Sequence, residues 1–149
     1  MDRDRLREEI AADEGCKLEI YLDHLGLPTM GIGHLITEDD PEYNQPVGTP
    51  VSEERVRQLF NLDIAVTLED CRILYRGFDS LPEEAQLVLA NMCFQLGRPR
   101  LSKFKRMNTA VDERQWDTAA EEMVQSRWHD QTPNRAKRLV KRMRDLGAE

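Results

Sequence analysis

Long hydrophobic runs are absent from this sequence of 149 residues. No segment approaches the roughly 20 consecutive apolar residues that a membrane-spanning helix needs, so we expect no stable insertion into a membrane. The charged residues 1–5 lead into no apolar segment, and no cleaved secretory signal is visible. Hydrophobic residues still make up 40% and charged residues 33%, a balance that indicates a folded globular protein.

Cysteine is also scarce, and the three cysteines are spread widely along the chain, at Cys16, Cys71 and Cys93. Because their number is odd and their surroundings are apolar, the pattern predicts buried, reduced thiols and not a disulfide framework. The three histidines are not spaced with cysteine or aspartate as zinc ligands are. The sequence therefore predicts no metal site and no cofactor.

Positive charge is in the minority, with 21 lysine and arginine residues against 28 aspartate and glutamate residues and a net charge of −7. This balance argues against a general nucleic-acid-binding protein. One segment departs from it, with six basic side chains and no acidic one: Arg135, Lys137, Arg138, Lys141, Arg142 and Arg144. The segment is either the solvated face of a helix or a patch for weak contact with a polyanion, such as an anionic cell envelope, and both interpretations stay open.

Strand signals are confined to one stretch near the N-terminus. Residues 3–12 have helical periodicity, and Gly15 can end that helix so that Glu14 lies in its last turn or just beyond it. Three short patterns follow in order: the alternation of a half-buried strand over 17–22, turn chemistry over 23–28, and a possible returning strand over 29–33. The sequence therefore predicts a small antiparallel sheet here.

The rest of the chain is expected to be helical after one loop. Residues 39–50 are rich in proline, glycine and acidic residues, which is typical of a loop. A serine-capped helix over residues 52–72 is long enough to connect two lobes. Residues 87–94 are apolar nearly all round, which predicts a central buried helix. The sequence thus predicts an α+β fold, with a small sheet first and a mainly helical lobe after it.

Two carboxylates of the N-terminal stretch, Glu14 and Asp23, lie nine residues apart. A glutamate at a helix end and an aspartate at a hairpin turn can face one cleft from two sides. Such a pair suits hydrolysis of a glycosidic bond, because a protonated carboxyl can donate to the leaving oxygen while an ionised one supports attack at the sugar carbon. The pair alone is a weak signal among 28 acidic residues, and Asp23 is also typical of an Asx turn.

Three motifs together resemble one known family. The stretch "DEG…IYLDHLGLPTMGIGHLIT", which begins at residue 13, is followed by "NMCFQLG" at 91–97 and "SRWHDQTPNRAKR" at 126–138. In this order they are similar to the phage-type lysozymes, glycoside hydrolase family twenty-four. The resemblance covers nearly the whole chain and implies a single domain with a lysozyme-like two-lobed fold. The implied parts of this 1–149 domain are a β-containing lobe (13–51), a connecting helix (52–72) and a helical lobe (73–149) with the helix of residues 3–12 packed on it.

The resemblance implies catalytic roles for three residues. Glu14 matches the family's general acid, Asp23 the second carboxylate that acts as a base on water, and Thr29 the threonine that helps to position this water. The family inverts the anomeric configuration, which requires the two carboxyl groups to stand roughly 6.5–9.5 Å apart. Taken alone, Thr29 is also an ordinary β-branched strand residue.

Supporting roles are implied for four further residues. Arg135 matches an arginine that pairs with the general acid across the cleft and orients it. Tyr21 can add a hydrogen bond at the same place. His34 and Asp63 match a structural ion pair, so we expect His34 to be structural and not catalytic.

Substrate contacts are less well defined by the resemblance. Leu35 and Phe94 match positions that line the saccharide cleft, although core packing is a comparable alternative for Phe94. Met107 and Glu122 stand where the family has a serine and an asparagine near the bound sugar. Contacts between the helical lobe and the substrate are therefore left open.

The implied activity is that of an endolysin, a muramidase acting on peptidoglycan glycan strands during bacterial cell lysis. It hydrolyses the β-1,4 bond between N-acetylmuramic acid and N-acetylglucosamine. The resemblance also implies a monomer that stays in the host cytoplasm until it is released to the cell wall. The alternative is a non-catalytic saccharide-binding or structural module of the same fold, which the intact trio of Glu14, Asp23 and Thr29 disfavours. A polyanion-binding protein without enzymatic activity is disfavoured by the acidic composition.

Overall fold

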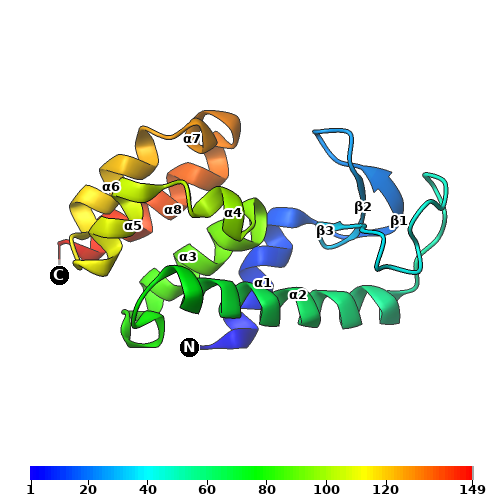
Figure 1. Cartoon of the computed structure of the whole chain (residues 1–149), viewed down its shortest axis with the longest axis horizontal. Helices are drawn as coiled ribbons and strands as arrows, with labels where there is room; N and C mark the ends of the chain where they lie inside the picture. The colour runs from blue at the N-terminus through cyan, green and yellow to red at the C-terminus, as the bar shows by residue number, and fades with distance from the viewer. Residues whose placement is uncertain (149) are drawn as a thin grey trace. The chain divides into compact units, whose positions relative to one another are not determined.

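The computed structural model describes residues 1–148, which are mostly helical with one small sheet near the N-terminus (Figure 1). The α+β class predicted from the sequence is confirmed. The chain forms two compact units: a β unit, Arg7–Val66, and a helical unit made of Met1–Leu6 and the chain from Thr67 onward. The boundaries fall inside the first and second helices, so each of these helices belongs to both units. The lobe boundaries implied by the resemblance, at residues 13, 52 and 73, stay a prediction.

The β unit begins in α1 (Arg3–Glu14), whose last residue is Glu14. Gly15 ends the helix because its φ of +73° is one that side-chain-bearing residues rarely adopt. Three antiparallel strands follow in the spatial order β1-β2-β3: β1 (Lys17–Leu22), β2 (Pro28–Gly31) and β3 (His34–Leu35). The sequence did not indicate β3, because two residues are too few to show an alternating pattern.

A small apolar core joins the sheet to the first part of α2 (Glu53–Leu74). Its buried members are Ile20, Met30, Ile36, Val51, Val56 and Leu59. The expected loop over 39–50 is present as a series of turns. Its end is tied to β1, because the Ile20 amide donates to the Thr49 carbonyl at 2.9 Å and Pro50 bridges to Glu19.

The helical unit is built around one buried helix. Its elements after α2 are η1 (Phe78–Ser80), α3 (Glu83–Leu96), α4 (Arg98–Leu101), α5 (Lys105–Asp112), α6 (Trp116–Val124), α7 (Arg127–Gln131) and α8 (Pro133–Leu146). Most of α3 is buried, which confirms the predicted central helix. α8 packs against α3, α6 and α7. In the part of the chain that the structure describes, no helix is both long and apolar enough to cross a membrane.

Two of the three cysteines are buried, as expected, and one is not. Cys71 in α2 and Cys93 in α3 lie in the interior, whereas Cys16, in the link between α1 and β1, is exposed. A hydrogen bond with Cys93, together with burial, raises the pKa of the Cys71 thiol well above its usual value. Because the thiolate is the reactive form, Cys71 is poorly reactive at neutral pH.

The basic segment 135–144 forms most of α8, and it is not an open cationic face. Arg135 is buried in the helical unit. Three further cations have acidic partners: Arg142 with Glu84 at 2.6 Å, Lys141 with Asp145 at 2.7 Å, and Arg144 with Glu121 at 3.8 Å. Contact with an anionic envelope stays a prediction, but these acids neutralise much of the charge that it would use.

Candidate active site

Glu14 lies at the end of α1, and its side chain is half-buried. The turn that joins β2 to β3 approaches it closely: a Cβ atom placed on Gly33 would lie 2.7 Å from Oε1 of Glu14. The backbone at Gly33 therefore forms one wall of the space that holds this carboxyl group. The end of α1 and the β2–β3 turn thus meet at Glu14. A cleft with Glu14 on one side and Asp23 on the other stays a prediction.

Asp23 lies in the turn that joins β1 to β2. Its Oδ1 accepts hydrogen bonds from the amides of Leu25 at 2.8 Å and Leu27 at 2.9 Å, so the Asx-turn interpretation is correct. The side chain is half-exposed, and within residues 1–148 no hydrogen bond to Oδ2 is observed. One oxygen therefore fixes the turn, and the other remains available to a water or a substrate.

Thr29 is buried in β2 at 4% exposure. It is paired with Tyr21 of β1 on one side and with Leu35 of β3 on the other. Its hydroxyl donates to the Leu27 carbonyl at 2.9 Å, which leaves the oxygen lone pairs as acceptors. Thr29 can therefore accept a hydrogen bond from a water molecule but has no second proton to donate.

Tyr21 connects the two carboxylates electrostatically. Burial raises the pKa of Tyr21, and the negative charges of Glu14 and then Asp23 raise it further. The Lys17 ammonium lies 4.4 Å from the centre of the Tyr21 ring and holds it from one side. Glu14 and Asp23 thus act on the same phenol, although one is on a helix and the other is on a turn.

His34, at the start of β3, contacts two carboxylates. Its Nδ1 lies 2.7 Å from Asp63 of α2, and its Nε2 lies 2.9 Å from Asp40. Burial alone would lower the pKa of His34, but the hydrogen bonds to Asp63 and Asp40 outweigh it and raise the pKa to about 9. The imidazolium therefore stays charged near neutral pH, which suits an ion pair and not an acid–base catalyst.

Asp40 is the second carboxylate partner of His34, and the sequence did not indicate it. It lies in the acidic loop, where neighbouring acids offer no pattern that selects it. Burial would raise the pKa of Asp40, but the Thr37 amide and His34 lower it below its usual value. Arg55 of α2 adds a longer contact at 3.7 Å. The network therefore fixes the loop and β3 to α2.

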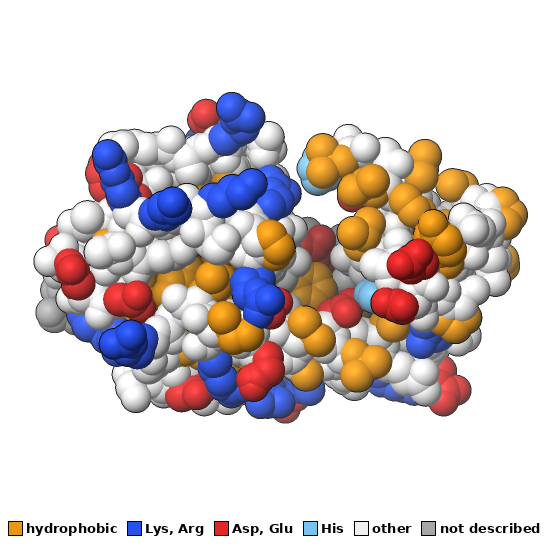
Figure 2. All heavy atoms as spheres, in the orientation of Figure 1, with side chains coloured by type: hydrophobic (Ala, Val, Ile, Leu, Met, Phe, Trp, Pro, Cys, Tyr) orange, Lys and Arg blue, Asp and Glu red, His pale blue; other side chains and the backbone are white. Residues whose placement is uncertain are grey.

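Leu35 is one of several exposed leucines in the β unit. It is 46% exposed, and Leu22, Leu25 and Leu27 around the Asp23 turn are 54%, 62% and 42% exposed. Figure 2 shows hydrophobic side chains gathered on this unit. Apolar surface beside Asp23 can contact the less polar faces of a sugar ring and its acetyl methyl group.

Arg135 and Phe94 belong to the helical unit. The Arg135 Nε donates to Asn91 Oδ1 at 2.9 Å, so a polar residue of α3, which the sequence did not single out, orients the guanidinium. Phe94 is half-buried, which leaves part of its ring accessible. Because both lie in a different unit from Glu14, the pairing of Arg135 with Glu14 and the role of Phe94 in the cleft stay predictions.

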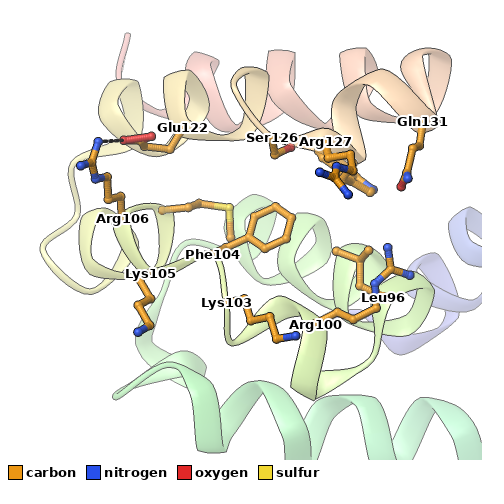
Figure 3. Close-up of a pocket in the computed structure, with 12 residues that line it drawn as sticks. Leu96, Arg100, Lys103, Phe104, Lys105, Arg106, Glu122, Ser126, Arg127 and Gln131 are labelled. Carbon is orange, nitrogen blue, oxygen red and sulfur yellow. Dashed lines mark ion pairs between the residues drawn. The ribbon is translucent and has the colours of Figure 1, made fainter.

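A groove of about 540 Å³ crosses the helical unit (Figure 3). Apolar atoms dominate its lining, and five basic side chains surround them: Arg100, Lys103, Lys105, Arg106 and Arg127. Figure 3 shows Phe104 between the α4–α5 wall and the wall that carries Ser126 and Arg127. Met107 and Glu122, where the sequence left substrate contacts open, both line the groove. The groove is suited to a ligand with apolar and anionic groups.

Comparison with known proteins gives a consistent result. A family model for phage lysozyme matches residues 11–145. Probable T4-type lysozyme 2 from Dictyostelium discoideum is 32% identical over 154 residues, which cover 91% of each chain. Peptidoglycan hydrolase gp36 of Pseudomonas phage phiKMV is 31% identical, over 92% of this chain and 15% of gp36. The pre-baseplate central spike protein Gp5 of Enterobacteria phage T4 is 28% identical, over 91% of this chain and 27% of Gp5.

Proposed function

Because the chain belongs to the phage lysozyme family and is a glycoside hydrolase, we propose that Glu14 and Asp23 are its catalytic pair. The substrate is peptidoglycan, and the bond is the β-1,4 linkage between N-acetylmuramic acid and N-acetylglucosamine. One arrangement supports this most directly: Glu14 ends α1 and Asp23 lies in the β1–β2 turn of the same compact unit, with Tyr21 of β1 close enough to feel the charge of both. A helix end and a hairpin turn thus present two acids to one small region.

In the proposed reaction, protonated Glu14 donates its proton to the glycosidic oxygen as the bond to the anomeric carbon breaks. Water attacks that carbon from the opposite face, and Asp23 accepts the proton that the water loses. The product sugar then has the inverted configuration. Two carboxyl groups, one protonated and one ionised, are sufficient for this chemistry.

The hydrogen bonds of the β unit support these roles. Two backbone amides hold Oδ1 of Asp23, which orients the carboxylate and leaves Oδ2 for the water. The Thr29 hydroxyl donates its hydrogen bond to the Leu27 carbonyl, so its oxygen can accept a hydrogen bond from the second O–H of the same water. A water held by two acceptors is oriented with a lone pair free for attack.

The biological context of this proposal is lysis of bacterial cells at the wall, with the host cytoplasm as the location before release. The test is clearing of a suspension of bacteria whose outer membranes have been removed. We expect Glu14→Gln to reduce clearing by at least about 1,000-fold, because removal of a general acid from an acid–base pair has effects of this order. Glu8→Gln, an exposed glutamate on the same helix, is the matched control and should clear like the wild type.

The outcomes of this test separate the candidate functions. Unchanged clearing by Glu14→Gln would overturn the assignment of Glu14. Absence of clearing by the wild type as well, with retained binding to purified walls, would favour a non-catalytic saccharide-binding module.

A further inference from the structure

The turn between β2 and β3 has a glycine directly against the carboxyl group of Glu14. A Cβ atom on Gly33 would lie 2.7 Å from Oε1, 3.0 Å from Cδ and 3.3 Å from Cγ of Glu14. Real Cβ atoms almost never approach other atoms within 3.0 Å. Any side chain at position 33 therefore requires the Glu14 side chain or the turn to move.

We propose that Gly33 is a positioning residue: its bare backbone is a wall that holds the Glu14 carboxyl at the place from which it donates its proton. This inference rests on the proposed role of Glu14.

The wall is anchored and cannot retreat freely. Gly31 ends β2 and His34 begins β3, so Ile32 and Gly33 form the tight turn between the two strands. Gly33 has a left-handed φ of +64°, which a residue with a side chain rarely adopts. The next residue, His34, is fixed by its two carboxylate partners at 2.7 and 2.9 Å.

Since Asp63 is part of α2, contacts run from α2 through Asp63, His34 and Gly33 to Glu14. This gives the structural ion pair a second consequence. It stabilises the β unit, and it also sets the position of the wall behind the general acid. A displacement of about 1 Å at a reacting group can lower the rate by about 100-fold.

Two other glycines of the β unit provide matched controls. Gly48 has a φ of +93°, and a Cβ atom added there would meet no atom within 4 Å, so Gly48→Ala introduces backbone strain without a collision. Gly31 has a φ of +62°, and its Cβ would meet the Val56 side chain at 3.0 Å. Gly31→Ala therefore combines strain with a collision against Val56 of the core, and its Cβ would have no Glu14 atom among its nearest neighbours.

The first experiment measures kcat and KM on a soluble peptidoglycan oligosaccharide for Gly33→Ala, Gly31→Ala, Gly48→Ala and Glu14→Gln. We expect Gly33→Ala to lower kcat by about 100-fold with KM within about twofold, because the proton donor is displaced while sugar contacts remain. Gly48→Ala and Gly31→Ala should lose thermal stability but keep kcat within about threefold. The Glu14 side-chain carboxyl ¹³C signal, identified by its loss in Glu14→Gln, should shift in Gly33→Ala alone.

A second measurement, of the unfolding temperature, applies if Gly33→Ala folds too poorly for its kinetics to be measured. If the added Cβ collides with Glu14, Gly33→Ala should lower the unfolding temperature of the wild type by more than it lowers that of Glu14→Ala, in which the Glu14 carboxyl is missing. Equal losses in the two backgrounds would overturn the inference. A Gly33→Ala enzyme with wild-type kcat would also overturn the inference. If Glu14→Gln were inactive in the same experiment, the proposed function would still stand. Full activity of Glu14→Gln would overturn both.

Discussion

Nδ1 of His34 lies 2.7 Å from Oδ2 of Asp63, across 29 residues of sequence, and joins the start of β3 to α2. Asp40 holds the other ring nitrogen, so the imidazolium lies between two carboxylates. This arrangement stabilises the part of the sheet that lies against Glu14. The stability of the β unit and the position of the proposed general acid therefore depend on the same contacts.

The first prediction concerns pH. The pKa of His34 is raised from 6.5 to about 9, so its contribution to stability is fully present below about pH 6.5 and is lost as the pH rises through about 9. This shift corresponds to about 3 kcal/mol of additional favourable interaction for the charged form of His34, and the two aspartates share it. We expect Asp63→Asn to lower the free energy of unfolding by about 1–2 kcal/mol at pH 6 and by much less at pH 10.

Chemical denaturation at pH 6, 8 and 10 measures this difference. Asp39→Asn, an exposed aspartate beside Asp40, is the control and should have little effect at any of these pH values. An Asp63→Asn effect that is the same at pH 6 and pH 10 would contradict the account.

The second prediction concerns the Thr29 hydroxyl. Thr29→Val keeps the shape of the side chain but removes the acceptor proposed for the water, so kcat should fall by about tenfold to 100-fold on a soluble oligosaccharide. Loss of the bond to the Leu27 carbonyl should lower the free energy of unfolding by about 1 kcal/mol. Thr29→Ser retains the hydroxyl and should keep most of the activity. If Thr29→Val and Thr29→Ser have equal kcat, the hydroxyl does not act on the water.

The third prediction concerns the basic helix α8. Arg142 is 22% exposed and donates from Nε to Glu84 at 2.6 Å, and Glu84 also accepts from Arg5. We expect Arg142→Ala to lower the free energy of unfolding by about 1–2 kcal/mol, because it leaves a partly buried carboxylate with one fewer partner. Lys137→Ala, an exposed change on the same helix, should be close to neutral.

Activity separates this structural role from contact with the cell envelope. A change that only weakens folding should lower lysis of cells and cleavage of a soluble oligosaccharide equally, per milligram of protein. A loss confined to whole cells at low salt would instead show that these cations act on an anionic envelope.

Local sequence patterns were sufficient for most of the fold. The end of α1 at Glu14, strand β1, the turn at Asp23 and the buried helix α3 each have a signal within a few neighbouring residues. The strand β3 has only two residues and therefore no pattern. The short helices α4 and α7 also give no periodicity, and the groove that they help to line could not be predicted.

The candidate site was predictable where a short motif carries the chemistry and not where distant residues meet. Glu14, Asp23 and Thr29 come from one continuous stretch. By contrast, the second partner of His34, Asp40, comes from a loop in which several acids are equivalent by composition. The contact between Gly33 and Glu14 depends on the path of a turn, which a glycine permits but does not specify. Likewise, the bond from Arg135 to Asn91 spans 44 residues and has no local signature.

The most direct test of the catalytic proposal is NMR observation of the first sugar product released from a soluble peptidoglycan oligosaccharide, before its anomers equilibrate. Hydrolysis of the β-1,4 bond by Glu14 and Asp23 with a water between them predicts that the α anomer appears first. It also predicts that Glu14→Gln releases no product on the same time scale while Glu8→Gln behaves like the wild type. Initial release of the β anomer would show retention of configuration and would contradict the proposed mechanism.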